Sequence, residues 1–156
     1  MTRRTVKGEL ASFSQREGEA WGGMLAVHAA VTRELDTELR RKHGLSLSAY
    51  EALLKLAWAP EGEMRMTELA HRCLLTPGGV TRIVAILVDD GLVERRIPPD
   101  NRRVVLAAIT DEGFARLQQA QRMHLAGVRR LFFDHLDDSA VDGLIEAWRR
   151  VRPPAD

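Results

Sequence analysis

The stretch from residue 76 to residue 110 constrains the fold most, because a helical pattern is followed directly by a hairpin pattern. The run TPGGVTRIVAILVDDG opens with Thr76, a good helix cap, and Pro77, whose missing amide hydrogen suits the first helical position. Apolar residues then recur at helical spacing and predict one buried stripe, made of Val80, Ile83, Val84 and Leu87. The β-rich runs GLVERRI and RRVVLAAIT follow on either side of PPDN and predict a two-stranded hairpin.

Two shorter helices are predicted before this stretch. LSLSAYEALLKLAWAP predicts a helix that is capped by Ser46 or Ser48 and ends at Pro60. EGEMRM predicts a turn, and TELAHRC predicts a helix capped by Thr67. Two short helices joined by a few residues, the second with a polar, glycine-bearing start, match a helix-turn-helix. Because a hairpin follows the second helix of this motif, we expect a winged helix over residues 46–109.

The two ends of the chain predict long helices. From Glu17 to His43 apolar residues recur at steps of three and four, and Gly44 ends that helix. Residues 110–152 predict two more helices, the first capped by Thr110. A winged helix core needs neither these helices nor the full length of the first one, so their apolar faces need another partner. The expected fold class is therefore mainly α with a small β-wing, in one domain spanning residues 1–156.

Composition limits the function classes. The formal net charge is only +1, so a case for nucleic acid must rest on where the charges lie. The single cysteine, Cys73, excludes an intramolecular disulfide and is typical of a reducing compartment. No apolar run approaches the roughly 20 residues that span a bilayer, and the polar start has no signal-peptide core. We therefore expect a cytoplasmic protein that does not interact with a membrane.

The first turn of the helix that begins at Pro77 is the first candidate DNA contact. Its stripe leaves six residues exposed, namely Thr76, Pro77, Gly78, Gly79, Thr81 and Arg82. Two glycines in a first helical turn each cost up to about 1 kcal/mol against alanine, which indicates that something approaches the backbone closely. The alternative is that these glycines only ease a tight turn between two helices.

The hairpin tip is the second candidate DNA contact. Arg102 and Arg103 stand at the tip, where they cannot contribute to a core. A narrow A·T-rich minor groove concentrates negative potential into a slot that fits an arginine, and Asp100 could orient the guanidinium of Arg102 through a charge-assisted hydrogen bond. Three further arginines extend the predicted basic surface, namely Arg72, Arg95 and Arg96. The alternative is a solvated turn whose charges only maintain solubility.

The run TPGGVTRIVAILVDDGLVERRIPPDNRRVVLAAITDEG resembles the signature of the MarR (multiple-antibiotic-resistance regulator) family of bacterial transcription factors. The resemblance extends in element order over essentially the whole chain and is most specific from Thr76 to Gly113. It implies that Asp100 and Arg102 form the wing-tip Asp-x-Arg motif, with the arginine in the minor groove. It also implies that Thr76 to Arg82 open the recognition helix. Asn101 stands where the family often has another charged residue.

The resemblance further implies a homodimer whose ends intertwine, so that residues 17–45 and 110–152 form the dimerisation helices. We expect such a dimer to act as a repressor that binds a pseudo-palindromic operator in double-stranded DNA, with half-sites about one helical turn apart. A small molecule, often aromatic or anionic, then binds between these helices and the winged domain and releases the operator. Four residues lie on elements that would line such a pocket, namely Trp21, His28, Tyr50 and Trp58. For each of them, a place in the core is the more common role than a ligand contact.

Other function classes receive less support from the sequence. No metalloprotease pair, phosphate loop or nucleophile elbow is present, so we expect no enzyme and no cofactor. His71 and Cys73 are two residues apart and point to different faces of a helix, which favours an exposed histidine and a buried cysteine over a metal site. A winged-helix module that binds another protein stays open as an alternative. That alternative predicts apolar exposed residues where the recognition helix has Thr81 and Arg82.

Overall fold

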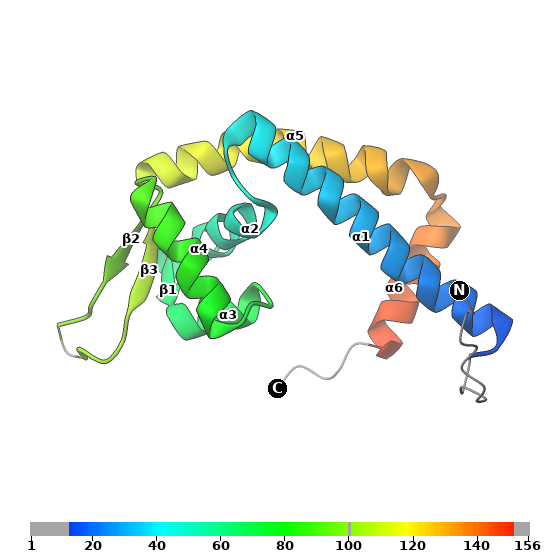
Figure 1. Ribbon diagram of the computed structural model, residues 1–156, viewed down its shortest axis with the longest axis horizontal. Helices are drawn as coiled ribbons and strands as arrows, with labels where there is room; N and C mark the ends of the chain where they lie inside the picture. The colour runs from blue at the N-terminus through cyan, green and yellow to red at the C-terminus, as the bar shows by residue number, and fades with distance from the viewer. Residues whose placement is uncertain (1–12, 100, 152–156) are drawn as a thin grey trace, which may run out of the picture. The chain divides into compact units, whose positions relative to one another are not determined.

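A computed structural model describes residues 13–99 and 101–151. By internal packing the chain divides into two units, residues 1–30 and residues 31–156. Figure 1 labels the helices and strands. The helices are α1 (Gln15–His43), α2 (Leu47–Ala57), α3 (Met66–Arg72), α4 (Pro77–Asp89), α5 (Asp111–Leu131) and α6 (Asp138–Val151). The strands are β1 (Glu63–Arg65), β2 (Val93–Arg96) and β3 (Leu106–Ile109).

The unit that ends at residue 30 contains the first half of α1, and this helix begins with a capping box. The backbone amide of Glu17 donates to the Ser14 hydroxyl at 3.3 Å, and the amide of Ser14 donates to the Glu17 carboxylate at 2.9 Å. These reciprocal bonds satisfy two amides at the helix start. The helix therefore starts at Gln15, two residues before the predicted start.

Helix α2 lies at the centre of the core in the second unit and packs against α3, α4, α5 and β3. Ser46 caps it, because its hydroxyl accepts a hydrogen bond from the Ala49 amide at 3.1 Å. Tyr50, Leu53 and Leu56 are almost fully buried, together with Val80, Val84 and Leu87 of α4. The predicted stripe of α4 thus faces the core, with Ile83 partly buried beside it.

The sheet differs from the prediction. It has three antiparallel strands in the order β1-β3-β2, whereas the sequence predicted two. The predicted turn EGEMRM contains β1, because Met64 is buried and its neighbours pair with β3. The cap predicted at Thr67 is also wrong, since α3 begins at Met66 and follows directly from β1. A strand of three residues is too short to show a period of two.

Candidate nucleic-acid interface

The start of α4 has the geometry that the sequence predicted. The Thr76 hydroxyl accepts a hydrogen bond from the Gly79 amide at 3.0 Å, and Pro77 occupies the first turn. Thr76, Pro77, Gly78, Thr81 and Arg82 are exposed, and Gly79 is half-buried. A Cβ at Gly79 would press on Thr76 Oγ1, but a Cβ at Gly78 would meet nothing within 4 Å. Local packing therefore accounts for Gly79 and does not account for Gly78.

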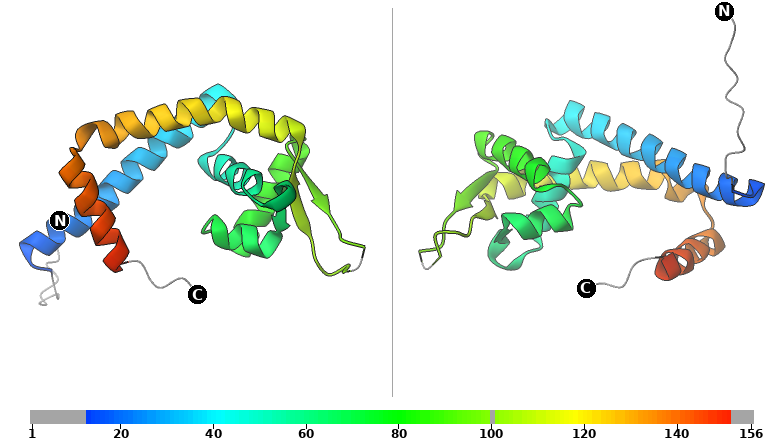
Figure 2. Two further views of the ribbon diagram at one scale, coloured as in Figure 1. Left: turned by 180° about the vertical axis from the view of Figure 1, so that it is seen from behind. Right: turned by 60° about the horizontal axis from the view of Figure 1, so that its bottom comes forward.

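The wing consists of β2, β3 and the connecting loop, residues 97–105, and Figures 1 and 2 show it extending beyond the helices of its unit. Asn101 organises the loop. Its amide donates to the Pro98 carbonyl at 3.2 Å, its carbonyl accepts from the Val104 amide at 3.1 Å, and its side chain accepts from the Arg103 amide at 3.2 Å. Arg102 and Arg103 are both exposed on this turn. The predicted bond from Asp100 to Arg102 lies outside the described residues.

The structure separates the arginines that the sequence grouped together. Arg95 Nη2 lies 3.5 Å from the carbonyl oxygen of Thr81, on α4. Arg96 instead donates to the carboxylates of Glu94 and Glu63, and these hydrogen bonds hold the pKa of Arg96 above its ordinary value. Arg72, at the end of α3, forms an ion pair with Glu68 at 2.7 Å.

The four residues predicted for an effector site do not share one environment. Tyr50 is buried, with its ring centroid 4.4 Å from that of His124, and burial raises the pKa of its hydroxyl. Trp58 is 67% exposed, and the Lys55 ammonium lies over its ring in a cation–π contact. Trp21 and His28 are exposed on the first half of α1, in the other unit.

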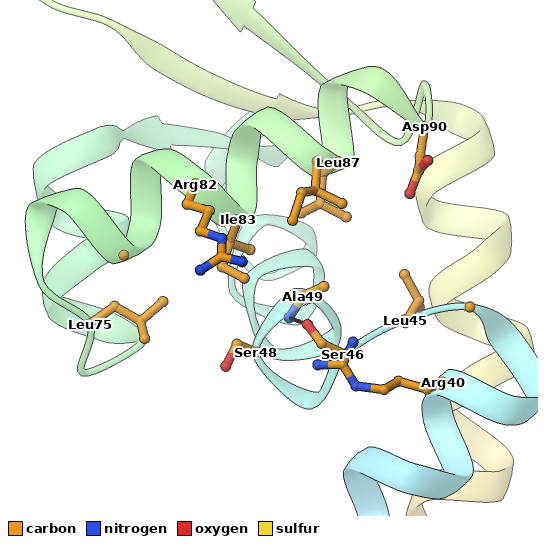
Figure 3. A pocket seen from close by; sticks show the side chains of 13 residues that line it. Arg40, Leu45, Ser46, Ser48, Ala49, Leu75, Arg82, Ile83, Leu87 and Asp90 are labelled. Carbon is orange, nitrogen blue, oxygen red and sulfur yellow. Dashed lines mark hydrogen bonds between the residues drawn. The ribbon is translucent and has the colours of Figure 1, made fainter.

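A pocket of about 400 Å³, which the sequence did not predict, lies between α4 and the corner joining α1 to α2. None of the four predicted effector residues lines it. Figure 3 shows the guanidinium groups of Arg82 and Arg40 pointing into this space from opposite sides, with Ser46 and Ser48 lining it nearby. Arg40 also forms an ion pair with Asp36 at 2.6 Å. The walls come from residues 40–49 and 75–90, which local sequence patterns cannot bring together.

Cys73 and His71 occupy the predicted environments. Cys73 is buried, and its burial raises the pKa of the thiol, whereas His71 is exposed. Among residues 13–99 and 101–151, no group of three or more metal-ligating side chains comes together. Within the same residues, no helix is long and apolar enough to cross a membrane.

A capped, exposed recognition helix beside an arginine-tipped wing defines a winged-helix DNA-binding protein. Comparison with known proteins supports this class. The family model described as "MarR family" matches residues 45–105. Sco3205, a MarR family transcriptional regulator from Streptomyces coelicolor solved in complex with DNA, is 30% identical, and the match covers 95% of each chain with a TM-score of 0.86. The chain belongs to the MarR family of transcriptional regulators.

Two other relatives bear on function. CouR from Rhodococcus jostii RHA1, solved with bound p-coumaroyl-CoA, is 26% identical with a TM-score of 0.75, and the match covers 92% of this chain and 99% of CouR. The HTH-type transcriptional repressor YetL of Bacillus subtilis is 30% identical over 95 residues. That match covers 61% of this chain and 57% of YetL.

Proposed function

We propose that the protein is a homodimeric repressor that places α4 in the major groove of a pseudo-palindromic operator and the wing in the adjacent minor groove. The observation that carries the proposal is the exposed, polar start of α4 beside a wing whose turn presents Arg102. An α-helix fits the major groove, and an arginine fits a narrow minor groove. The proposed contacts are Arg72, Thr76, Pro77, Gly78, Gly79, Thr81, Arg82, Arg95, Arg102 and Arg103, and Asp100 is proposed to orient Arg102.

Exposed apolar side chains support the homodimer. Leu125 and Phe133 are 44% and 46% exposed, and Ile145 and Trp148 of α6 are 42% and 47% exposed. Trp21 on the first half of α1 is 51% exposed. Large apolar side chains left exposed on the terminal helices are typical of a protein–protein interface. We therefore assign residues 17–45 and 110–152 to dimerisation and residues 46–109 to DNA binding.

The test is a fluorescence-anisotropy titration on the intergenic DNA beside the protein's own gene, against a scrambled duplex of the same length. We expect selective binding by two protomers per duplex, with an affinity that falls steeply as salt is raised. Selection from a random DNA pool then defines the operator if it lies elsewhere. Equal, weak binding to every duplex in both experiments would contradict the proposal and favour a protein-binding winged helix.

A response to a small molecule is the second part of the proposal. The pocket between α4 and the α1–α2 corner supports it, because a ligand there would touch the recognition helix, and a volume of about 400 Å³ suits a small ligand. CouR supplies a family precedent for ligand binding. Compounds that release DNA from the parent protein should fail to release it from Ser48→Phe, which narrows the pocket. Equal release from both proteins would place the effector elsewhere, for example near Trp21, His28, Tyr50 or Trp58.

A further inference from the structure

We infer that Arg96 positions the wing, by bridging β2 to β1, and does not itself contact DNA. The inference rests on the proposed function, in which the wing must reach the minor groove at a defined angle. It also corrects the sequence-based grouping of Arg96 with the DNA-binding arginines.

Strand alternation separates Arg95 from Arg96. Successive side chains of a strand point to opposite faces of the sheet. Val93 is buried on one face of β2, and Arg95, two residues later, shares that face and reaches toward α4. Arg96 therefore lies on the other face, together with Glu94. Two adjacent arginines on opposite faces cannot both be directed at one DNA surface.

The register brings two carboxylates beside Arg96. Glu94 of β2 and Glu63 of β1 are both paired with Ala108 of the central strand β3. The small side chain of Ala108 leaves room for a guanidinium to span the two outer strands. Arg96 Nη1 donates to Glu63 Oε2 at 2.9 Å, and Arg96 also donates to Glu94. The two carboxylates thus surround the one cation, which lowers its attraction for a phosphate.

Glu63 is well placed to transmit this contact to the helix-turn-helix. β1 ends at Arg65, and α3 begins at the next residue without an intervening loop. The ion pair therefore links the wing strand β2 to the first helix of the motif. A backbone hydrogen bond from the Met66 amide to the Val105 carbonyl, 3.1 Å long, ties the start of α3 to the wing residue that precedes β3. β1 has only three residues, so its alignment depends strongly on such additional contacts.

The exposure of the three charged side chains indicates whether loss of their ion pairs affects global stability or only the wing. The Arg96 and Glu94 side chains are 53% and 50% exposed, and that of Glu63 is 22% exposed. Exposed ion pairs contribute little to global stability. The network should therefore affect the orientation of the wing and leave the unfolding midpoint of the protein nearly unchanged.

The variants Arg96→Gln, Glu63→Gln and the double variant test the inference in two ways. On operator DNA, each single variant should lose about tenfold in affinity, and the double variant should lose no more than either. Glu63→Gln is decisive, because removing a negative charge near DNA would strengthen binding if Arg96 contacted a phosphate. The slope of log affinity against log salt should stay unchanged in Arg96→Gln, whereas loss of a phosphate contact would lower it by about one.

Amide hydrogen exchange on the DNA-free protein provides the second test. Exchange at the paired amides of β1 and β3 should accelerate in both single variants, while exchange in α2 stays as in the parent. Unchanged exchange, or a tighter operator complex with Glu63→Gln, would overturn the inference. If the parent protein binds no DNA selectively, the proposed function fails, and the exchange data still decide whether Arg96 holds the wing.

Discussion

Leu74, in the turn between α3 and α4, adopts a backbone conformation that leucine avoids. Its φ is +54°, in the left-handed region, and its side chain is 93% exposed. The left-handed conformation costs a residue with a Cβ roughly 1 to 2 kcal/mol. No packing of the side chain offsets this cost, so the strain arises from the need to turn the chain between two helices.

Replacing Leu74 should therefore stabilise the protein only when the Cβ is removed. We expect Leu74→Gly to exceed Leu74→Ala in unfolding free energy by about 1 kcal/mol, after allowance for the greater freedom of glycine in the unfolded chain. Urea denaturation of both variants measures the difference. A glycine variant less stable than the alanine variant would show that the turn carries no strain.

His124 on α5 makes stability depend on pH. Its Nδ1 atom is buried without a hydrogen-bond partner in the part of the chain that the structure describes, and burial lowers its pKa from the ordinary value of 6.5. Below that value the unfolded chain binds a proton that the folded chain does not, so stability falls as the pH falls.

We expect the unfolding free energy of the parent to decrease from pH 7 to pH 5, with a contribution from His124 of at most about 1.4 kcal/mol per pH unit. His124→Phe keeps a ring beside Tyr50 and should show a shallower decrease over the same range. Between pH 7 and pH 8 the two curves should run parallel. An identical decrease in both proteins would assign the effect to other groups.

Among the elements, α5 meets the turn before β2 so closely that only glycine fits. A Cβ on Gly113 would fall well inside van der Waals contact with the Leu92 carbonyl oxygen, whereas a Cβ on Gly143 of α6 would meet nothing within 4 Å. We expect Gly113→Ala to lower the free energy of unfolding by about 1 to 3 kcal/mol. Gly143→Ala, the matched control, should stabilise it by up to about 1 kcal/mol, as measured by urea denaturation at one protein concentration. Similar stability of the two variants would contradict the close packing.

The wing is the element whose tip should read the flanks of the operator. Arg102→Ala should lose roughly 1 to 3 kcal/mol of operator binding and relax the preference for an A·T-rich flank. Arg102→Lys keeps the positive charge but lacks the planar guanidinium group. This variant should therefore recover only the part of the affinity that comes from charge. Anisotropy titrations on duplexes with A·T and G·C flanks separate the loss of affinity from the loss of flank preference. Parent-like affinity and flank preference in Arg102→Ala would exclude the tip from the interface.

For the whole molecule, the exposed apolar residues of α6 should control assembly. Trp148→Glu places a charge on the proposed dimer surface and should raise the dimer dissociation constant by at least about 100-fold, since buried unpaired charges are costly. Glu146→Lys changes a charge on the opposite face of the helix and should leave the dimer intact. Sedimentation velocity of both variants gives the oligomeric state. A dimeric Trp148→Glu protein would remove α6 from the interface.

How much of the molecule follows from its sequence depends on the range of the interactions. Helix caps and helical stripes involve residues three or four apart, so the sequence identified Thr76 and Thr110 as caps and narrowed the cap of α2 to Ser46 or Ser48, of which Ser46 is the cap. The winged helix followed from the order of these elements, and the family from the motif between Thr76 and Gly113. The candidate DNA contacts at the start of α4 were visible for the same reason.

The tertiary structure decided what depends on residues distant in the chain. β1 exists because Glu63, Met64 and Arg65 pair with β3, more than 40 residues later, and three residues alone carry no readable period. The pocket beside Arg82 and the ion pair from Arg96 to Glu63 arise in the same way. The sequence by itself determined the helices, the wing and the caps at Thr76 and Thr110, while β1 and the face on which Arg95 or Arg96 projects were decided by strand register, which only packing against the rest of the fold sets.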